Sequence, residues 1–201
     1  KFLFKPLDLV GLESQLNELS WSWSEQFVQL LGNEEGRDCF PLDYQHAFTP
    51  QQALKDWQDC CKISQDRSLV LQMMPLTSGL AFKIFHKDSP LTLSQLMPIF
   101  DGFGLKALTE QTFKLLNGAG ESVWLHCFIC EGDPLSPDCL HHLIETFTAV
   151  WFAKAENDLF NQLVIDAGLS LSQVVLFRAY YKALKQMGMT YSLSSVADVL
   201  K

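Results

Sequence analysis

Residues 68–87, SLVLQMMPLTSGLAFKIFHK, decide the class of fold that the sequence predicts. Two short apolar runs, at 68–74 and 79–87, flank the segment PLTSG, whose proline, serine and glycine are typical of a tight connection. In the second run, large apolar residues recur at every second position, as expected for a β-strand: Leu80, Phe82 and Ile84. The stretch therefore predicts two strands joined as a hairpin.

A second pair of strands is predicted downstream, after a helix. The segment LTLSQLMPIFDGFG, residues 91–104, has a helical apolar pattern. Strand patterns then cover residues 105–116 and 122–130, on either side of NGAGE. With one helix before the first hairpin and another after the last strand, residues 51–152 predict an α+β fold. We expect a ferredoxin-like antiparallel sheet with helices on one face and a strand order that can be permuted.

Two helices are predicted ahead of the first hairpin. Residues 8–31 carry a helical apolar pattern that ends at Gly32, a residue suited to the left-handed C-cap position. In the following helix Thr49 is the expected N-cap, and Pro50 occupies the first helical position, where an amide hydrogen has no partner within the helix.

The remainder of the chain is predicted to be wholly helical. One buried stripe is expected along the first of these helices: Leu140, Ile144, Phe147, Trp151 and Ala155. The helix at 171–188 carries two apolar stripes, which are Val174, Phe177, Tyr181 and Leu184, and Leu176, Tyr180, Ala183 and Met187. A helix that is apolar over so much of its circumference is normally buried on more than one side. We therefore expect it to contact either the preceding α+β module or a further domain.

The composition limits the classes of partner. Hydrophobic residues make up 48% of the 201 residues, which is ample for a packed core, and the formal net charge is −8. Because phosphate groups are bound by concentrated positive charge, we expect no nucleic acid and no membrane as partners. The sequence has no run long enough for a transmembrane helix and no signal-peptide pattern at its start. It lacks an initiator methionine, and a helical pattern still runs at Lys201, so we expect a piece of a longer polypeptide.

Cysteine usage predicts reduced, mostly buried thiols in a cytoplasmic protein. The spacing closest to a metal motif joins Cys127 and Cys130, but residues three apart on a strand point to opposite faces. His126, in the same strand, is predicted to be a partly buried packing residue. No glycine-rich phosphate loop and no nucleophile elbow is present in the sequence. We predict no catalytic, cofactor-binding or metal-binding residue in this chain.

The turn DGFG, residues 101–104, is one candidate site. Asp101, Gly102 and Gly104 form a helix-to-strand turn at which backbone atoms can approach a small effector. Plain turn geometry is the alternative interpretation.

The segment AEND, residues 155–158, is the second candidate. Glu156, Asn157 and Asp158 are predicted at three consecutive helical positions, so they fan around the helix, which disfavours a paired-carboxylate catalytic site. One of them can instead cap the next helix, and a carboxylate can form a bidentate pair with Arg178. We interpret the cluster as the joint between two packed helices.

An ordered series of short motifs runs through the chain. Towards the end it comprises Ala155-Glu156-Asn157-Asp158, Phe160-Asn161, Leu163-Val164, Ala167-Gly168-Leu169, Arg178-Ala179-Tyr180 and Gln186-Met187-Gly188. CFPLDYQHAFTPQQALKDW, LTLSQLMPIFDGFGLKALTE and VWLHCF stand upstream in that order. The series resembles the large bacterial NAD-dependent glutamate dehydrogenases with very long subunits, over essentially the whole chain.

The resemblance implies an internal fragment that covers the last ACT-like module and the helical connector upstream of the catalytic core. It implies three parts: an N-terminal helical segment at 1–64, an ACT-like α+β module at 65–134, and the helical connector at 135–201. The expected function is regulatory and scaffolding, without catalysis in this fragment.

The resemblance also implies a parent reaction and partners. The parent would convert L-glutamate, NAD and water into 2-oxoglutarate, ammonium and NADH, with NAD as its cofactor and no cofactor in this fragment. Expected partners are the C-terminal catalytic core of the same polypeptide, further subunits of a homo-oligomer and a small-molecule effector. The alternatives are a self-sufficient amino-acid-binding sensor module of ACT type and an independent enzyme.

Overall fold

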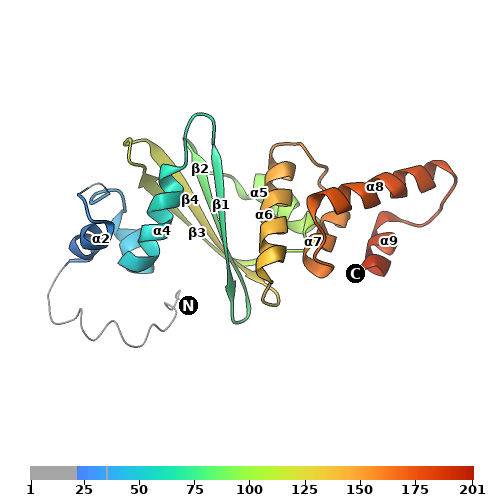
Figure 1. Cartoon of the computed structure of the whole chain (residues 1–201), viewed down its shortest axis with the longest axis horizontal. Helices are drawn as coiled ribbons and strands as arrows, with labels where there is room; N and C mark the ends of the chain where they lie inside the picture. The colour runs from blue at the N-terminus through green and yellow to red at the C-terminus, as the bar shows by residue number, and fades with distance from the viewer. Residues whose placement is uncertain (1–21, 35) are drawn as a thin grey trace. The chain divides into compact units, whose positions relative to one another are not determined.

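A computed structural model of the chain describes residues 22–34 and 36–201 (Figure 1). The described residues divide into two compact units. Unit 1 holds those up to Val70 with Ile84–Pro90 and Gln111–His126, and unit 2 holds Leu71–Lys83, Leu91–Glu110 and Cys127–Lys201. The start of the helix predicted over 8–31 lies outside the described residues, so the first described element is α2 (Trp23–Leu31).

Four antiparallel strands form a sheet in the order β1-β2-β4-β3. The strands are β1 (Leu69–Leu76), β2 (Gly79–Lys87), β3 (Lys106–Leu116) and β4 (Ser122–Glu131). At the end of β2, the amide of Lys87 donates to the carbonyl of Ser68, and the amide of Asp88 donates to the carbonyl of Ser122. The end of β2 thus meets the starts of both its neighbours, and the predicted hairpin is confirmed.

The topology is that of a permuted ferredoxin-like unit. The helices after β2 and β4 are α5 (Leu93–Gly102) and α6 (Pro137–Trp151). Taken from β2 onwards, with β1 counted as the last strand, the elements follow a βαββαβ order. The α+β class is therefore confirmed, and the strand order, which the sequence left open, is the permuted one.

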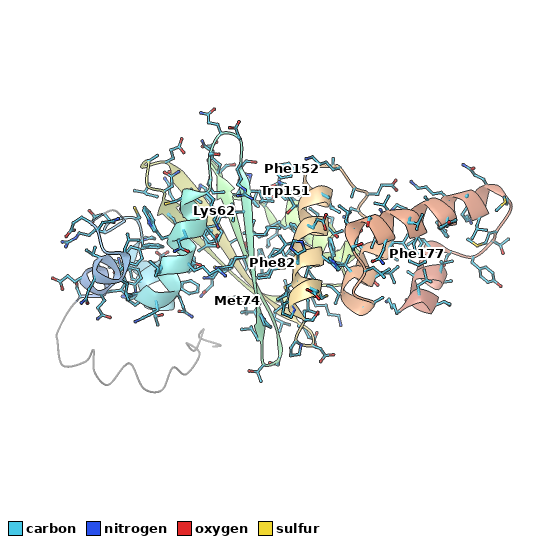
Figure 2. The ribbon with its side chains drawn as sticks, viewed as in Figure 1. Lys62, Met74, Phe82, Trp151, Phe152 and Phe177 are labelled. Atoms are coloured by element: carbon cyan, nitrogen blue, oxygen red, sulfur yellow. The ribbon has the colours of Figure 1, made fainter. Side chains whose placement is uncertain are left out.

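Aromatic side chains attach α5 and α6 to the sheet in unit 2. Phe82 of β2 is fully buried, and its ring centroid lies 5.2 Å from that of Phe100 on α5 and 5.0 Å from that of Phe147 on α6 (Figure 2). The ring of Phe128, on β4, lies 5.0 Å from that of Phe100. Burial of such large rings is a main source of folding stability, so this cluster holds α5 in place.

The described residues of unit 1 include the helices α2, α3 (Leu42–Ala47) and α4 (Pro50–Cys61). Gly32 ends α2 with a φ of 79°, the left-handed conformation that glycine adopts without strain. Thr49 caps α4, and Pro50 lies in its first turn. The predicted cap residues at all three positions are confirmed.

Strand β3 lies at an edge of the sheet, and only its second half contributes to a core. Residues 106–112 are exposed, whereas Phe113 and Leu115 are buried. In unit 1 the ring of Phe113 lies 5.5 Å from that of Tyr44, whose hydroxyl donates to Asp56 over 2.6 Å.

The chain after α6 is helical, in four short to medium elements. They are η1 (Leu159–Gln162), α7 (Leu163–Asp166), α8 (Leu171–Gln186) and α9 (Leu193–Leu200). In the described part of the chain, no helix combines the length and the apolar character that crossing a bilayer requires.

The buried face of α6 differs from the predicted stripe. That stripe was Leu140, Ile144, Phe147, Trp151 and Ala155, whereas the buried residues are Cys139, Leu143, Thr146, Phe147, Ala149 and Val150. The helix ends before Ala155, and only Phe147 belongs to both sets. The apolar side chains form one broad arc, and the predicted stripe lies at one edge of it, so periodicity alone does not determine which part of the arc packs.

The aromatic cluster of unit 2 generates a stability prediction with a matched control. Phe82→Ala leaves a cavity in a packed interior and is expected to lower the free energy of unfolding by about 3–5 kcal/mol. Phe152→Ala removes the same ring from a side chain that is 43% exposed, so we expect a change below about 0.5 kcal/mol. Urea titration of both variants measures this, and equal losses would contradict the assignment of Phe82 to the core.

Candidate functional site

The segment 155–158 is not helical, which corrects the prediction of three consecutive helical positions. Helix α6 ends at Trp151, and Ala153 then adopts a left-handed conformation with a φ of 54°. Glu156, Asn157 and Asp158 follow in an irregular segment before η1. Because the segment is irregular rather than helical, neighbouring side chains can reach different elements of the fold.

Asp158 joins η1 to α8. Its Oδ1 accepts a hydrogen bond from the amide of Phe160 over 3.0 Å, which caps η1. The same carboxylate accepts two hydrogen bonds from Arg178, from Nε to Oδ2 over 2.7 Å and from Nη2 to Oδ1 over 3.0 Å. The cap and the bidentate pair, proposed as separate possibilities for this segment, are thus both made by Asp158.

Arg178 is buried, with 4% of its surface exposed, and its Nη2 has two further acceptors. Nη2 also donates to the side-chain oxygen of Asn161 over 2.9 Å and to the carbonyl of Glu156 over 3.3 Å. The Asn161 amide in turn donates to that same carbonyl over 3.2 Å. These acceptors offset the desolvation penalty that a buried guanidinium carries.

Glu156 forms a second link to α8, at the surface. Its carboxylate pairs with Lys182, one turn beyond Arg178, and both side chains are more than half exposed. The hydrogen bond from Lys182 lowers the pKa of Glu156 below its usual value. Exposed pairs of this kind contribute little to stability, so the buried pair determines the geometry.

Asn157 points to α5 instead of α8. Its side-chain amide donates to the carbonyl of Pro98 over 2.7 Å. A Cβ placed on Gly102 would lie 2.2 Å from the Asn157 side-chain oxygen, so only glycine fits there without movement. Gly104 has a φ of +70°, and a Cβ placed on it would lie 3.4 Å from the side chain of Gln162.

Gly102 of the predicted turn and the predicted cluster Glu156, Asn157, Asp158 and Arg178 therefore meet in one site, which we call the junction. It consists of Pro98 and Gly102 on α5, residues 156–158, Asn161, and Arg178 with Lys182 on α8. Asp101 lies outside it: its side chain is exposed, and its carbonyl accepts from the amide of Gly104 over 3.0 Å. Three members of the junction were not predicted from the sequence: Pro98, Asn161 and Lys182. Lys182 carried a signal, since it stands four residues after Arg178 on the same helical face.

A surface hollow of about 750 Å³ adjoins Gly104 in unit 2. Its walls combine apolar side chains with charged and amide groups: Phe103, Leu105, Leu135, Ile165, Glu131, Asp133, Asp166, Gln162 and Lys201. Lys201 pairs with Asp166 over 3.5 Å at one wall. The volume of the hollow is within the range of small-molecule sites, but its lining is more polar than such sites usually have.

Cys127, Cys130 and His126 lie in buried surroundings within the sheet. Cys127 and Cys130 are both buried, and burial raises the pKa of Cys130 to about 12, so this thiol stays protonated at neutral pH. His126 is also buried, and its Nδ1 lies 3.0 Å from the hydroxyl of Thr112. Across residues 22–34 and 36–201, no three His, Cys, Asp or Glu side chains are grouped as metal ligands.

The buried pair of the junction gives the first prediction for this site. Arg178→Met removes the partner of Asp158 and leaves its carboxylate largely out of water, so the free energy of unfolding should fall by about 3–5 kcal/mol. Lys182→Met removes an exposed pair on the same helix and should cost at most about 1 kcal/mol. Guanidinium denaturation compares the two variants, and a loss for Lys182→Met as large as for Arg178→Met would refute the ranking.

The close approach of α5 gives the second prediction. Gly102→Ala forces the Asn157 side chain away from Pro98 and should cost about 1–3 kcal/mol. In an Asn157→Ala background the same substitution has room, so a double-mutant cycle should show a coupling energy of about 1 kcal/mol or more. Gly118→Ala, whose Cβ would meet its nearest atom at 3.6 Å, is the control. Strict additivity between positions 102 and 157 would disprove the contact.

Two known protein families match this chain, one over the sheet with α5 and one over the helices after α6. Residues 71–136 match the family described as glutamate dehydrogenase, ACT3 domain, which covers the strands and α5. Residues 155–201 match the family described as glutamate dehydrogenase, helical motif 3, which begins at the segment AEND.

Three curated proteins are similar to the chain over nearly its whole length. Each is named NAD-specific glutamate dehydrogenase. The protein from Pseudomonas aeruginosa is 32% identical over 96% of this chain, that from Halomonas elongata 29% over 96%, and that from Mycobacterium tuberculosis 33% over 95%. The chain spans 13% of the length of each of these relatives.

Proposed function

Since the chain belongs to the NAD-specific glutamate dehydrogenase family, as its ACT3 and helical motif 3 region, we propose that it is a regulatory and scaffolding segment of such an enzyme. In this proposal the segment carries no catalytic site of its own. It receives a structural signal in the α+β sheet and its helices, and it presents α8 and α9 to the rest of the enzyme.

The junction is the observation that carries this proposal. Two adjacent residues attach to two different elements: Asn157 binds the carbonyl of Pro98 on α5, and Asp158 binds Arg178 on α8. Because one peptide unit separates these attachments, a displacement of the end of α5 acts directly on α8. Packed elements joined in this way tend to shift as a unit instead of deforming.

The outer surface of α8 supports the scaffolding part. Leu176 is 53% exposed, Tyr180 62% and Met187 75%. These residues belong to the second apolar stripe, which the sequence analysis expected a partner to cover. A contiguous apolar patch of this kind marks a contact surface. Its partner in this proposal is the catalytic core of the same polypeptide, and the parent is a homo-oligomer in the cytoplasm.

The parent reaction follows from the family. The parent would oxidise L-glutamate to 2-oxoglutarate and ammonium, with NAD bound in the catalytic core and not in this segment. The hollow beside Gly104 supports the binding of a regulatory molecule, since it adjoins the turn whose Gly102 contacts Asn157 of the junction. A small-molecule effector such as an amino acid would act there.

Steady-state kinetics of the longer polypeptide test the proposal. Gly102→Ala disturbs the junction without touching α8, so we expect the kcat/KM for L-glutamate to change about 5-fold or more, as for coupling energies of about 1–3 kcal/mol. Gly118→Ala, the same change at an uncrowded position, should behave as the unmodified enzyme. Wild-type kinetics and wild-type assembly by light scattering for Gly102→Ala would contradict the proposal.

Thermal melts of the same proteins with millimolar amino acids examine the effector. A ligand at a hundred times its Kd adds about 2.7 kcal/mol, which corresponds to a shift of several degrees. A shift with an amino acid, together with unchanged kinetics of Gly102→Ala, would favour the self-sufficient sensor module over the scaffold.

A further inference from the structure

An apolar groove separates α8 from α9. Its volume is about 350 Å³, and its walls include Phe177, Tyr180, Tyr181 and Leu184 of α8 with Val196 and Leu200 of α9. All of these side chains are apolar or aromatic. Figure 2 marks Phe177 on α8, and Figure 1 shows the chain leaving α8 and returning as α9.

The groove is preformed, because each helix is fixed separately. Val174 and Arg178 of α8 are buried, and Arg178 is held by Asp158. Ala197 of α9 is buried as well, where α9 packs against η1. The ring of Tyr181 lies 5.5 Å from that of Phe160 in η1. Both helices are thus anchored to the same short segment, and these contacts set the spacing between them.

The surface around the groove is also apolar. Met187 and Tyr191, in the connection after α8, are 75% and 68% exposed, and Val199 of α9 is 85% exposed. A groove lined by apolar side chains at helical spacing is the geometry that accepts the apolar face of a further helix. Water in such a groove makes few hydrogen bonds to its walls, so covering it is favourable.

We propose that this groove holds the apolar face of a helix from another part of the same polypeptide. The inference rests on the proposed function and goes further, since it names the surface and the kind of partner. The relatives supply such a segment, because the matched region makes up 13% of their length and the remainder lies on the same chain. The helical motif 3 match covers residues 155–201, which contain both walls of the groove.

A tethered helix is a better occupant than a second copy of the chain. Seven side chains line the groove, whereas a stable interface between separate proteins takes roughly 20–30 residues on each side. A segment on the same polypeptide binds at an effective concentration of the order of millimolar, so a small apolar contact suffices. The energetic cost of bringing two free molecules together does not arise.

Thiol accessibility tests this proposal in the longer polypeptide and in the 201-residue chain. The background is Cys61→Ser, which removes the exposed native cysteine. Val196→Cys places a thiol on the α9 wall of the groove, outside the apolar surface of α8, and Ala179→Cys places one at an exposed position of α8 outside the groove. We expect the longer polypeptide to slow maleimide labelling at position 196 at least 10-fold relative to the 201-residue chain. Labelling at position 179 should change less than 3-fold.

The outcomes separate this inference from the proposed function. Equal labelling rates at position 196 in both proteins would overturn the groove as a docking site, whatever the kinetics of Gly102→Ala show. Protection that disappears on dilution would assign the groove to a second copy and would equally overturn the proposal. Protection at position 196 that persists on dilution, with position 179 still reactive, is the expected result. A circular dichroism spectrum unchanged by each substitution confirms that α8 and α9 are intact.

Discussion

The buried positive charge of Arg178 is the constraint on which the second half of the structure depends. A guanidinium group with 4% of its surface exposed is tolerated only if carboxylate and carbonyl oxygens surround it. Asp158, Asn161 and the carbonyl of Glu156 meet this demand, and all three come from one short segment. The position of that segment against α8 is thus fixed by electrostatics as well as by packing. The chain has little freedom between the end of α6 and the start of α8.

The junction also explains why two clusters that are distant in the sequence belong together. Gly102 was considered as a place where backbone could approach a ligand, and the group that approaches it is the side chain of Asn157. A glycine that a close contact requires gives the same sequence signal whether the contacting group belongs to a ligand or to the chain itself. The distinction needs the tertiary structure, since more than fifty residues separate positions 102 and 157.

The predictions from sequence held where local chemistry decides the structure. Alternation in residues 79–87 identified β2, and Gly32, Thr49 and Pro50 marked helix ends, because capping depends on neighbours in the chain. They were wrong where tertiary contacts decide. The end of α6 at Trp151, ahead of the segment AEND, has no strong local signal, and the buried face of α6 was misplaced because the apolar arc of that helix is wider than the predicted stripe. The pairing of Asp158 with Arg178 was proposed from charge and spacing, but the choice between Glu156 and Asp158 required coordinates.

The edge strand β3 has a consequence for behaviour at high concentration. Its residues 106–112 are exposed, and charged side chains recur along it at Lys106, Glu110 and Lys114. A long exposed edge strand can template pairing with strands of other molecules, and charges spaced along the strand oppose such pairing. The sheet can therefore end in an eleven-residue strand without becoming a nucleus for aggregation. Neutralising those charges is expected to lower the solubility of the protein more than it lowers its free energy of unfolding.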